Sequence, residues 1–249
     1  MRDKIKNKDY FNCNIELHSN LIQRGLNLLK GGKVVETQIP RFKKGIFDNY
    51  FFILICSYSI GHDKETIKRN LLNAIDYLKD SWSSEIVLLN NQGKIYNQYA
   101  ENYDEMLWML SLGYLLNIDE KDFKKLVDVI DRDNVKDFLF EFIIRAKLKD
   151  REIIVEESYQ VFFGIPNVFE KLRQAINESN KKNAEKLAKD FITKDWYKKH
   201  KDSGWYNSHK SKHDSYFGYW SFETAAIVKI MNLNDSEFGD NQYYPKDLI

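Results

Sequence analysis

The sequence predicts an all-α protein, a compact bundle of about ten helices. Glycine and proline are scarce, at 11 and 3 of 249 residues, which argues against a turn-rich β-sandwich and against flexible linkers. Apolar residues recur at helical spacing almost throughout, and two-residue alternation is confined to fragments such as 153–155. The composition, 43% hydrophobic and 30% charged, is that of a folded globular chain and excludes wholesale disorder.

Two early helices have recognisable boundaries. The apolar run 50–60 precedes Gly61, and glycine readily takes the left-handed conformation that closes a helix. Asp63 can then cap a helix whose apolar stripe runs through 67–78. Residues 101–117 hold few charges among apolar side chains, so this segment is expected to be a central helix.

The clearest helical period lies in residues 119–131. Four apolar side chains fall at i, i+3, i+4 and i+7 and so form one stripe: Phe123, Leu126, Val127 and Ile130. Asp119 is its expected N-cap. Asn134 is expected to cap a second helix over 134–146, antiparallel to the first because the connection is short.

The second half of the chain continues the helical pattern. Residues 169–176 and 184–192 predict a pair of helices, separated near Ser179-Asn180. A last helix is expected over 216–231. The charged corner at residues 131–134 is the expected seam between an N-terminal part, 1–132, and a C-terminal part, 133–249. Neither part is bounded by a flexible linker, so we expect them to pack as one body.

Membrane insertion and secretion find no support in the sequence. The longest apolar run, 50–60, is shorter than the roughly 20 residues of a membrane-spanning helix, and no hydrophobic signal region follows the first residues. Cys13 and Cys56 are the two cysteines and lie in no Cys-x-x-Cys arrangement, so both are interpreted as reduced thiols. A cytoplasmic protein is expected.

The charge is regional. Residues 1–48 hold 10 basic and 5 acidic side chains, whereas the whole chain has a net charge of only +1. Such a total supplies no strong field for general nucleic-acid binding and excludes a chain that imitates DNA by being acidic throughout. The basic stretch 30–44 has no glycine-rich phosphate loop and is interpreted as a solvated loop.

The C-terminal segment is the richest in polar chemistry. His200, His209 and His213 fall in no familiar metal-ligand spacing, and nearby lysines would repel a cation, so neither a metal nor a cofactor is expected. Glu223 is placed among apolar residues of the helix expected over 216–231. A buried carboxylate needs a hydrogen-bond partner, which predicts an internal polar network of Tyr58, Ser59, His209, Tyr219, Trp220 and Glu223. The alternative is an acid/base pair of Glu223 with His209 or His213 in a hydrolase-like enzyme.

A family resemblance rests on motifs at both ends of the chain. Arg2-Asp3, the Tyr58–Gly61 element and the segment 107–126 resemble the N-terminal part of the polymorphic-toxin nuclease immunity family, PoNi. The runs 216–226 and 243–248 are similar to its C-terminal part. The resemblance implies a bacterial cytoplasmic antidote, without catalysis of its own, that binds a cognate DNase toxin. The basic first 48 residues depart from this picture, because they do not suit a basic DNA-binding cleft.

A DNase holds a polyanion, so an inhibitor that covers its cleft needs acidic side chains together with aromatic contacts. The strongest local excess is in residues 101–137, with 10 acidic and 5 basic side chains. The candidate toxin-binding residues are therefore Asp104, Glu105, Glu120, Asp128, Asp131, Asp133, Trp205 and Tyr206. A solvated helical face with its caps explains the same acidic residues, and a basic N-terminal nucleic-acid adaptor is a third hypothesis.

Overall fold

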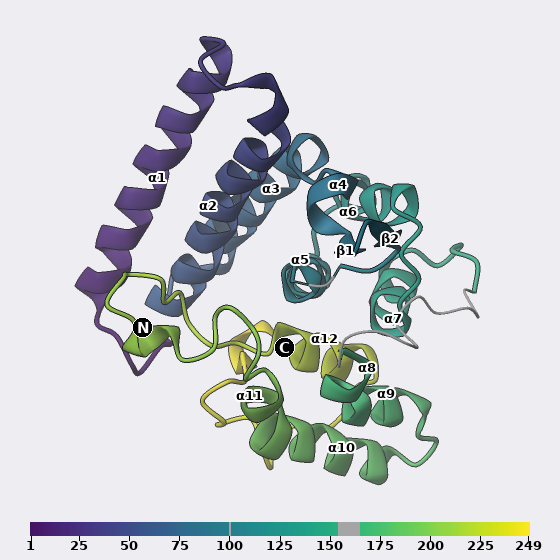
Figure 1. The fold of residues 1–249 in the computed structure, drawn as a ribbon. Coiled ribbons are helices and arrows are strands. Elements are labelled where there is room, and N and C mark those ends of the chain that lie inside the picture. The colour runs from purple at the N-terminus through teal and green to yellow at the C-terminus, as the bar shows by residue number, and fades with distance from the viewer. Residues whose placement is uncertain (100, 154–164) are drawn as a thin grey trace.

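The computed structural model describes residues 1–99, 101–153 and 165–249, and within these ranges it is helical, as the sequence predicts (Figure 1). Of the fragment 153–155, residues 154 and 155 lie outside the described residues. The helices are α1 (Lys8–Lys30), α2 (Ile39–Ile60), α3 (Lys64–Ser81), α4 (Ser84–Val87), α5 (Tyr103–Leu115), α6 (Glu120–Arg132), α7 (Phe138–Lys147), α8 (Ile165–Val168), α9 (Glu170–Asn177), α10 (Lys181–Asp190), α11 (Trp196–Lys199) and α12 (Phe222–Ile230). A π turn, η2 (Phe191–Asp195), joins α10 to α11, and three short 3₁₀ turns are η1 (Glu36–Gln38), η3 (Ser208–Lys210) and η4 (Lys246–Leu248).

One small sheet, which the sequence analysis does not predict, is present in the described part of the chain. Its strands β1 (Leu89–Asn91) and β2 (Lys94–Tyr96) are antiparallel, with Asn91 opposite Lys94. Gln92 and Gly93 between them have φ of 52° and 86°. Positive φ at both central residues is the requirement of the two-residue turn that matches strand twist. In the sequence, only the turn residues Gln92 and Gly93 indicate this hairpin, because strands of three residues are too short to show apolar alternation.

The N-terminal half is layered around α5. Helices α1 and α2 lie side by side over their length, α3 follows against α2, and α6 packs on α3 (Figure 1). Helix α5 contacts α3, α6, α7 and α12, which explains why nearly all of its residues are apolar and buried. At Gly113 a Cβ would lie 2.9 Å from the Phe123 ring, so glycine permits the close approach of α6.

Several boundaries agree with the expected caps, and one does not. Gly61 closes α2 with φ of 94°, and the Asp63 side chain accepts a hydrogen bond from Thr66 N at the start of α3. Asp119 occupies the N-cap position of α6, but its side chain makes no capping hydrogen bond. Asn134 does not cap the next helix: Asp137 does, accepting from the first backbone N–H groups of α7. Asn134 has φ of 51° and lies in the turn between the helices.

Helices α6 and α7 correspond to the pair expected to pack antiparallel, but they are not each other's main packing partners. Helix α6 packs chiefly on α3 and α5, and α7 on α5 and α12. The pair predicted further along is confirmed, since α9 and α10 pack together on either side of residues 178–180.

The last long helix is shorter than expected. Helix α12 begins at Phe222, not at 216, because Gly218 has φ of 116° and the chain there runs across Ser59. The Ser59 hydroxyl donates to the Phe217 carbonyl at 2.6 Å. Residues 222–228 of α12, the polar Thr224 included, are all buried, so this part of the helix is enclosed on all faces.

The two ends of the chain meet, which makes the N- and C-terminal parts one body. Arg2 forms an ion pair with Asp247 at 2.5 Å, and Tyr58 OH donates to the same carboxylate. The Tyr10 hydroxyl donates to the Tyr216 carbonyl at 3.0 Å. Figure 1 shows the C-terminus near the centre of the molecule, beside α12, and the N-terminus below the lower end of α1. Among the described helices, none is both long and apolar enough to cross a membrane.

Candidate functional site

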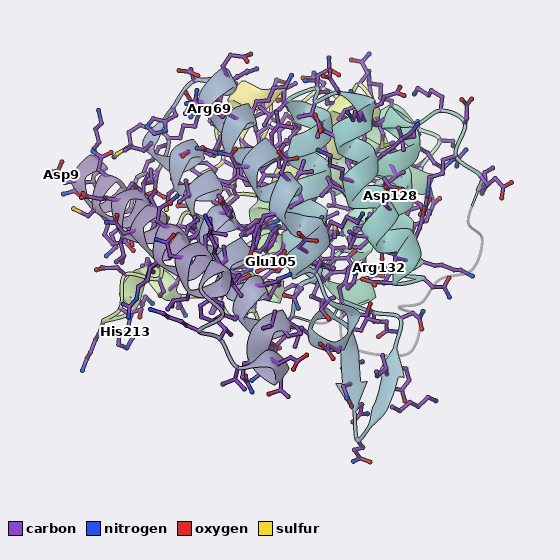
Figure 2. All side chains as sticks on the ribbon, turned by 90° about the horizontal axis from the view of Figure 1, so that it is seen from above. Asp9, Arg69, Glu105, Asp128, Arg132 and His213 are labelled. Carbon is purple, nitrogen blue, oxygen red and sulfur yellow. The ribbon has the colours of Figure 1, made fainter. Side chains whose placement is uncertain are left out.

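A groove with a volume of about 930 Å³ lies between α2, α5 and the loop that follows α11. Five carboxylates line it, together with aromatic side chains. The acidic residues are Asp48, Glu101, Asp104, Glu105 and Asp202, and the aromatic residues are Phe51, Phe52, Tyr103, Trp108, Phe169, Trp205 and Phe217. Figure 2 labels Glu105 on α5. The three predicted toxin-binding residues Asp104, Glu105 and Trp205 therefore share one site. We call it the acidic groove.

Asp104 anchors the loop after α11 to α5. Trp205 Nε1 donates to Asp104 Oδ2 at 2.9 Å, and His200 Nε2 lies 3.6 Å from Oδ1. His200 Nδ1 lies 2.5 Å from the Trp196 carbonyl and must donate there, so Nε2 needs a second proton to face a carboxylate. Burial opposes this charge, yet Asp104 raises the pKa of His200 above its usual value. Burial alone would raise the pKa of Asp104, but His200 and Trp205 hold it below the ordinary value.

A second charged cluster lies beside Asp104. Lys44 Nζ is 2.8 Å from Glu105 Oε2 and also bonds to Asp48, while only 8% of the Lys44 side chain is exposed. Burial raises the pKa of Glu105 to about 7, although Lys44 acts against this shift. Burial would lower the pKa of Lys44, but the two carboxylates raise it. The expected solvated loop 30–44 is thus wrong at its end, because residues from 39 onward belong to α2 and Lys44 is buried.

The aromatic wall of the acidic groove is tightly packed. Trp205 stacks on Trp196, with ring centroids 5.3 Å apart, and also contacts Trp108 at 5.8 Å. Phe217 meets the Phe52 ring edge-on at 5.4 Å. Tyr206 packs on Tyr197 and is not part of the groove lining. The groove therefore offers half-buried aromatic surface that is already held in place.

The remaining acidic candidates lie elsewhere. Glu120 and Asp128 are exposed on α6, where Figure 2 labels Asp128. Asp131 is exposed and forms an ion pair with Arg151 at 2.7 Å. Asp133 corrects the prediction, because its carboxylate is buried and accepts hydrogen bonds from Tyr99 and Ser84 at 2.7 and 2.6 Å. Its side chain holds the core together and has no free surface for a partner.

The expected single polar network is divided into separate groups. Trp220 Nε1 donates to Ser59 at 2.8 Å, whereas Tyr58 bonds to Asp247. His209 Nδ1 lies 2.8 Å from Tyr219 OH. Of these contacts, Trp220–Ser59 ties the 209–220 segment to α2, as does the bond from Ser59 to the Phe217 carbonyl. Within the described residues no group of three or more His, Cys, Asp or Glu side chains is arranged to hold a metal ion.

Glu223 lies in a group of its own, with 0% exposure. Its Oε1 accepts from Trp196 Nε1 and from the Ser221 hydroxyl, both at 2.6 Å. The network expected from the sequence contains a tryptophan, Trp220, but the indole that bonds to Glu223 is that of Trp196. His209 lies instead against Tyr219, and His213 is exposed whereas Glu223 is fully buried, so neither histidine of the enzyme alternative is paired with Glu223. Trp196 links Glu223 to His200, because its indole N–H donates to Glu223 and its carbonyl faces His200 Nδ1. Sequence analysis does not predict this role, since Trp196 and Glu223 are 27 positions apart.

Burial raises the pKa of Glu223 to about 7, which predicts a pH-dependent stability. The folded state holds this proton more tightly than the unfolded chain does. The protonated carboxyl therefore makes its full contribution to the free energy of unfolding below the unfolded pKa, and this contribution is lost as pH rises through about 7. Glutamine does not titrate, so we expect Glu223→Gln to reduce the difference in unfolding free energy between low and high pH by about 3 kcal/mol. Urea unfolding of both proteins at pH 5 and pH 8 measures it, and Glu105 remains in both as a shared background. Parallel pH profiles would contradict the assignment.

The model of the PoNe immunity protein (PoNi) N-terminal region matches residues 2–128, and that of the PoNe immunity proteins (PoNi) C-terminal region matches residues 135–248. A comparison with curated proteins gives no match. A solved structure described as "The Crystal Structure of Protein PA2201 from Pseudomonas aeruginosa" is similar with a TM-score of 0.64 and 13% identity. The alignment covers 99% of this chain and 88% of that one, and at this identity it shows a shared fold alone.

Proposed function

The chain belongs to the PoNe immunity proteins (PoNi), and from this premise we propose that it neutralises a cognate DNase toxin by forming a stoichiometric complex. Membership of this family implies that the chain neutralises a toxin. We propose in addition that this toxin is a DNase and that inhibition occurs by binding. The complex would form in the cytoplasm, where a DNase reaches the genome and where the free thiols of Cys13 and Cys56 remain reduced.

The observation that carries this proposal is the acidic groove. A DNase surface that holds DNA is electropositive, so carboxylates such as Asp48, Glu101 and Asp202 complement it. Both lysines that line the groove are engaged: Lys44 with Glu105 and Asp48, and Lys199 with Asp195. Because Lys44 and His200 pair with groove carboxylates, the free negative charge comes from Glu101 and Asp202, which are exposed and form no ion pair within the described residues.

The packing of the groove supports tight binding. Trp205 is held by Asp104 on one edge and by Trp196 on one face before any partner arrives. Binding then costs little side-chain entropy at these positions, because the rings do not have to be ordered by the toxin. Half-buried tryptophans at the centre of an interface are typical of residues that contribute most binding energy.

Titration of DNase activity tests the proposal. With toxin fixed at a concentration well above Kd, we expect activity to fall linearly and to vanish at one equivalent of this protein. Such a sharp end point requires nanomolar or tighter affinity, which an interface of about 1,600 Å² supports. An enzyme that inactivates the toxin would instead act below one equivalent and increasingly with time. That time dependence, or residual activity at several equivalents, would contradict stoichiometric inhibition.

A further inference from the structure

A second groove, of about 550 Å³, lies between α1 and α2. Its floor is apolar and includes Leu21, Leu28, Phe42 and Ile46. The two helices approach closely here because α1 carries Gly25, where a Cβ would lie 2.8 Å from the Ile46 side chain. Leu21 is 40% exposed, so the groove presents apolar surface to solvent. We call this surface the α1–α2 groove.

Its charge is the opposite of that in the acidic groove. Arg24 and Arg41 are exposed and line it, and its lining contains no carboxylate. Across the described residues, neither arginine has an ion pair or a hydrogen bond to a side chain, in contrast to Lys44. Asn49, also in the lining, already bonds to His18 and to the Gly45 carbonyl. Two free guanidinium groups therefore stand over an apolar floor.

The two grooves share helix α2. Lys44 and Asp48 line the acidic groove, whereas Gly45 and Asn49, the residues directly after them, line the α1–α2 groove. Successive residues of a helix point about 100° apart, so the grooves occupy neighbouring faces of one rigid element. A protein that fills the acidic groove would reach the α1–α2 groove by extending across the width of α2.

We propose that the α1–α2 groove is a second contact for the same toxin, and that it binds a toxin segment carrying acidic and apolar side chains. This inference rests on the proposed function. Charge complementarity selects an acidic segment, and the apolar floor selects a protein segment over a phosphate backbone, which would leave the leucines uncovered. It also gives a role to the exposed arginines of the basic first 48 residues, whose charge does not suit the electropositive part of a DNase.

Charge reversal tests the contact. Arg24→Glu with Arg41→Glu changes two exposed, unpaired side chains and should leave folding intact. We expect calorimetry to show toxin binding at least 10-fold weaker than for the wild type. The matched control is Lys33→Glu with Lys149→Glu, which changes the net charge equally at exposed positions outside both grooves. A loss in the arginine variant that exceeds the control loss supports the contact; equal affinities of the two variants overturn it.

The wild-type arm separates this inference from the proposed function. If the wild type forms no complex with the toxin, both fail. If the wild type binds and inhibits but the arginine variant binds as tightly as its control, only the second contact fails. Inhibition at one equivalent should persist in the arginine variant at micromolar concentrations, because the acidic groove is unchanged.

Cross-linking identifies the occupant directly. A Cβ at Gly45 would meet nothing within 4 Å, so Gly45→Cys is accommodated and can carry a photoreactive maleimide in a Cys13→Ser background. We expect illumination of the toxin complex to join this position to a toxin peptide rich in Asp or Glu and apolar residues. Lys94→Cys, on the exposed β-hairpin, is the control. Cross-linking at Gly45→Cys no stronger than at Lys94→Cys, or to a basic peptide, would overturn the proposal.

Discussion

Trp205→Ala is expected to weaken the toxin complex by about 2–4 kcal/mol, a loss of roughly 30- to 1,000-fold in affinity. The indole contributes the groove-facing aromatic surface and is fixed by its hydrogen bond to Asp104 and its stacking on Trp196. The effect should appear mainly as faster dissociation, because a buried aromatic contact forms after the charges have guided encounter. Surface plasmon resonance with immobilised toxin measures both rates.

Two variants separate binding from folding at this position. Trp205→Phe keeps an aromatic ring but removes the N–H that Asp104 accepts, and should lose less affinity than Trp205→Ala. Tyr206→Ala removes the next aromatic residue, which packs on Tyr197 outside the groove. If Tyr206→Ala costs as much as Trp205→Ala at equal melting temperatures, the toxin does not sit in the acidic groove.

Local pattern predicts the helices well because their determinants are close in sequence. The stripe of α6, the cap at Asp63 and the glycine at 61 each act within a few residues. Beyond Asp104 and Glu105 in its first turn, helix α5 is apolar on nearly every side, and such a segment is buried wherever the chain places it. The start of α12 was misjudged because Gly218 and the Ser59 contact, 158 positions from Phe217, keep the preceding segment extended.

The candidate site was harder to predict because an acidic residue looks the same in a sequence whether it is solvated or paired. Asp128 and Asp133 are five positions apart, yet one is exposed and the other bonds to Tyr99 inside the core. The acidic groove itself arises where Asp48 on α2 meets Asp104 and Asp202, which come from distant parts of the chain. Local sequence pattern does not predict which distant residues lie together. Sequence analysis therefore does not identify Asp48, Glu101 and Asp202 as candidate toxin-binding residues.

The exposed acidic face of α6 predicts a different kinetic effect. Glu120→Lys with Asp128→Lys and Asp131→Lys replaces three exposed carboxylates that lie off the buried stripe, so the helix should remain folded. If this face guides the protein toward an electropositive toxin, association at low salt should slow by about 10- to 100-fold, while dissociation changes little. Wild-type association should fall as salt rises, and association of the triple variant should depend on salt much less.

Asp131 needs its own control, because it pairs with Arg151, which Glu141 also holds at 2.7 Å. The double variant Glu120→Lys with Asp128→Lys leaves that pair intact and should show most of the kinetic effect. Stopped-flow measurements at 50 and 300 mM salt give the association rate of each variant. Trp205→Ala serves as the comparison, because it is expected to change dissociation and not association. Together they distinguish electrostatic guidance from direct contact with the toxin. Equal association rates and equal salt dependence in all α6 variants would mean that Glu120 and Asp128 are only solvated side chains. Recognition would then rest on the grooves on either side of α2.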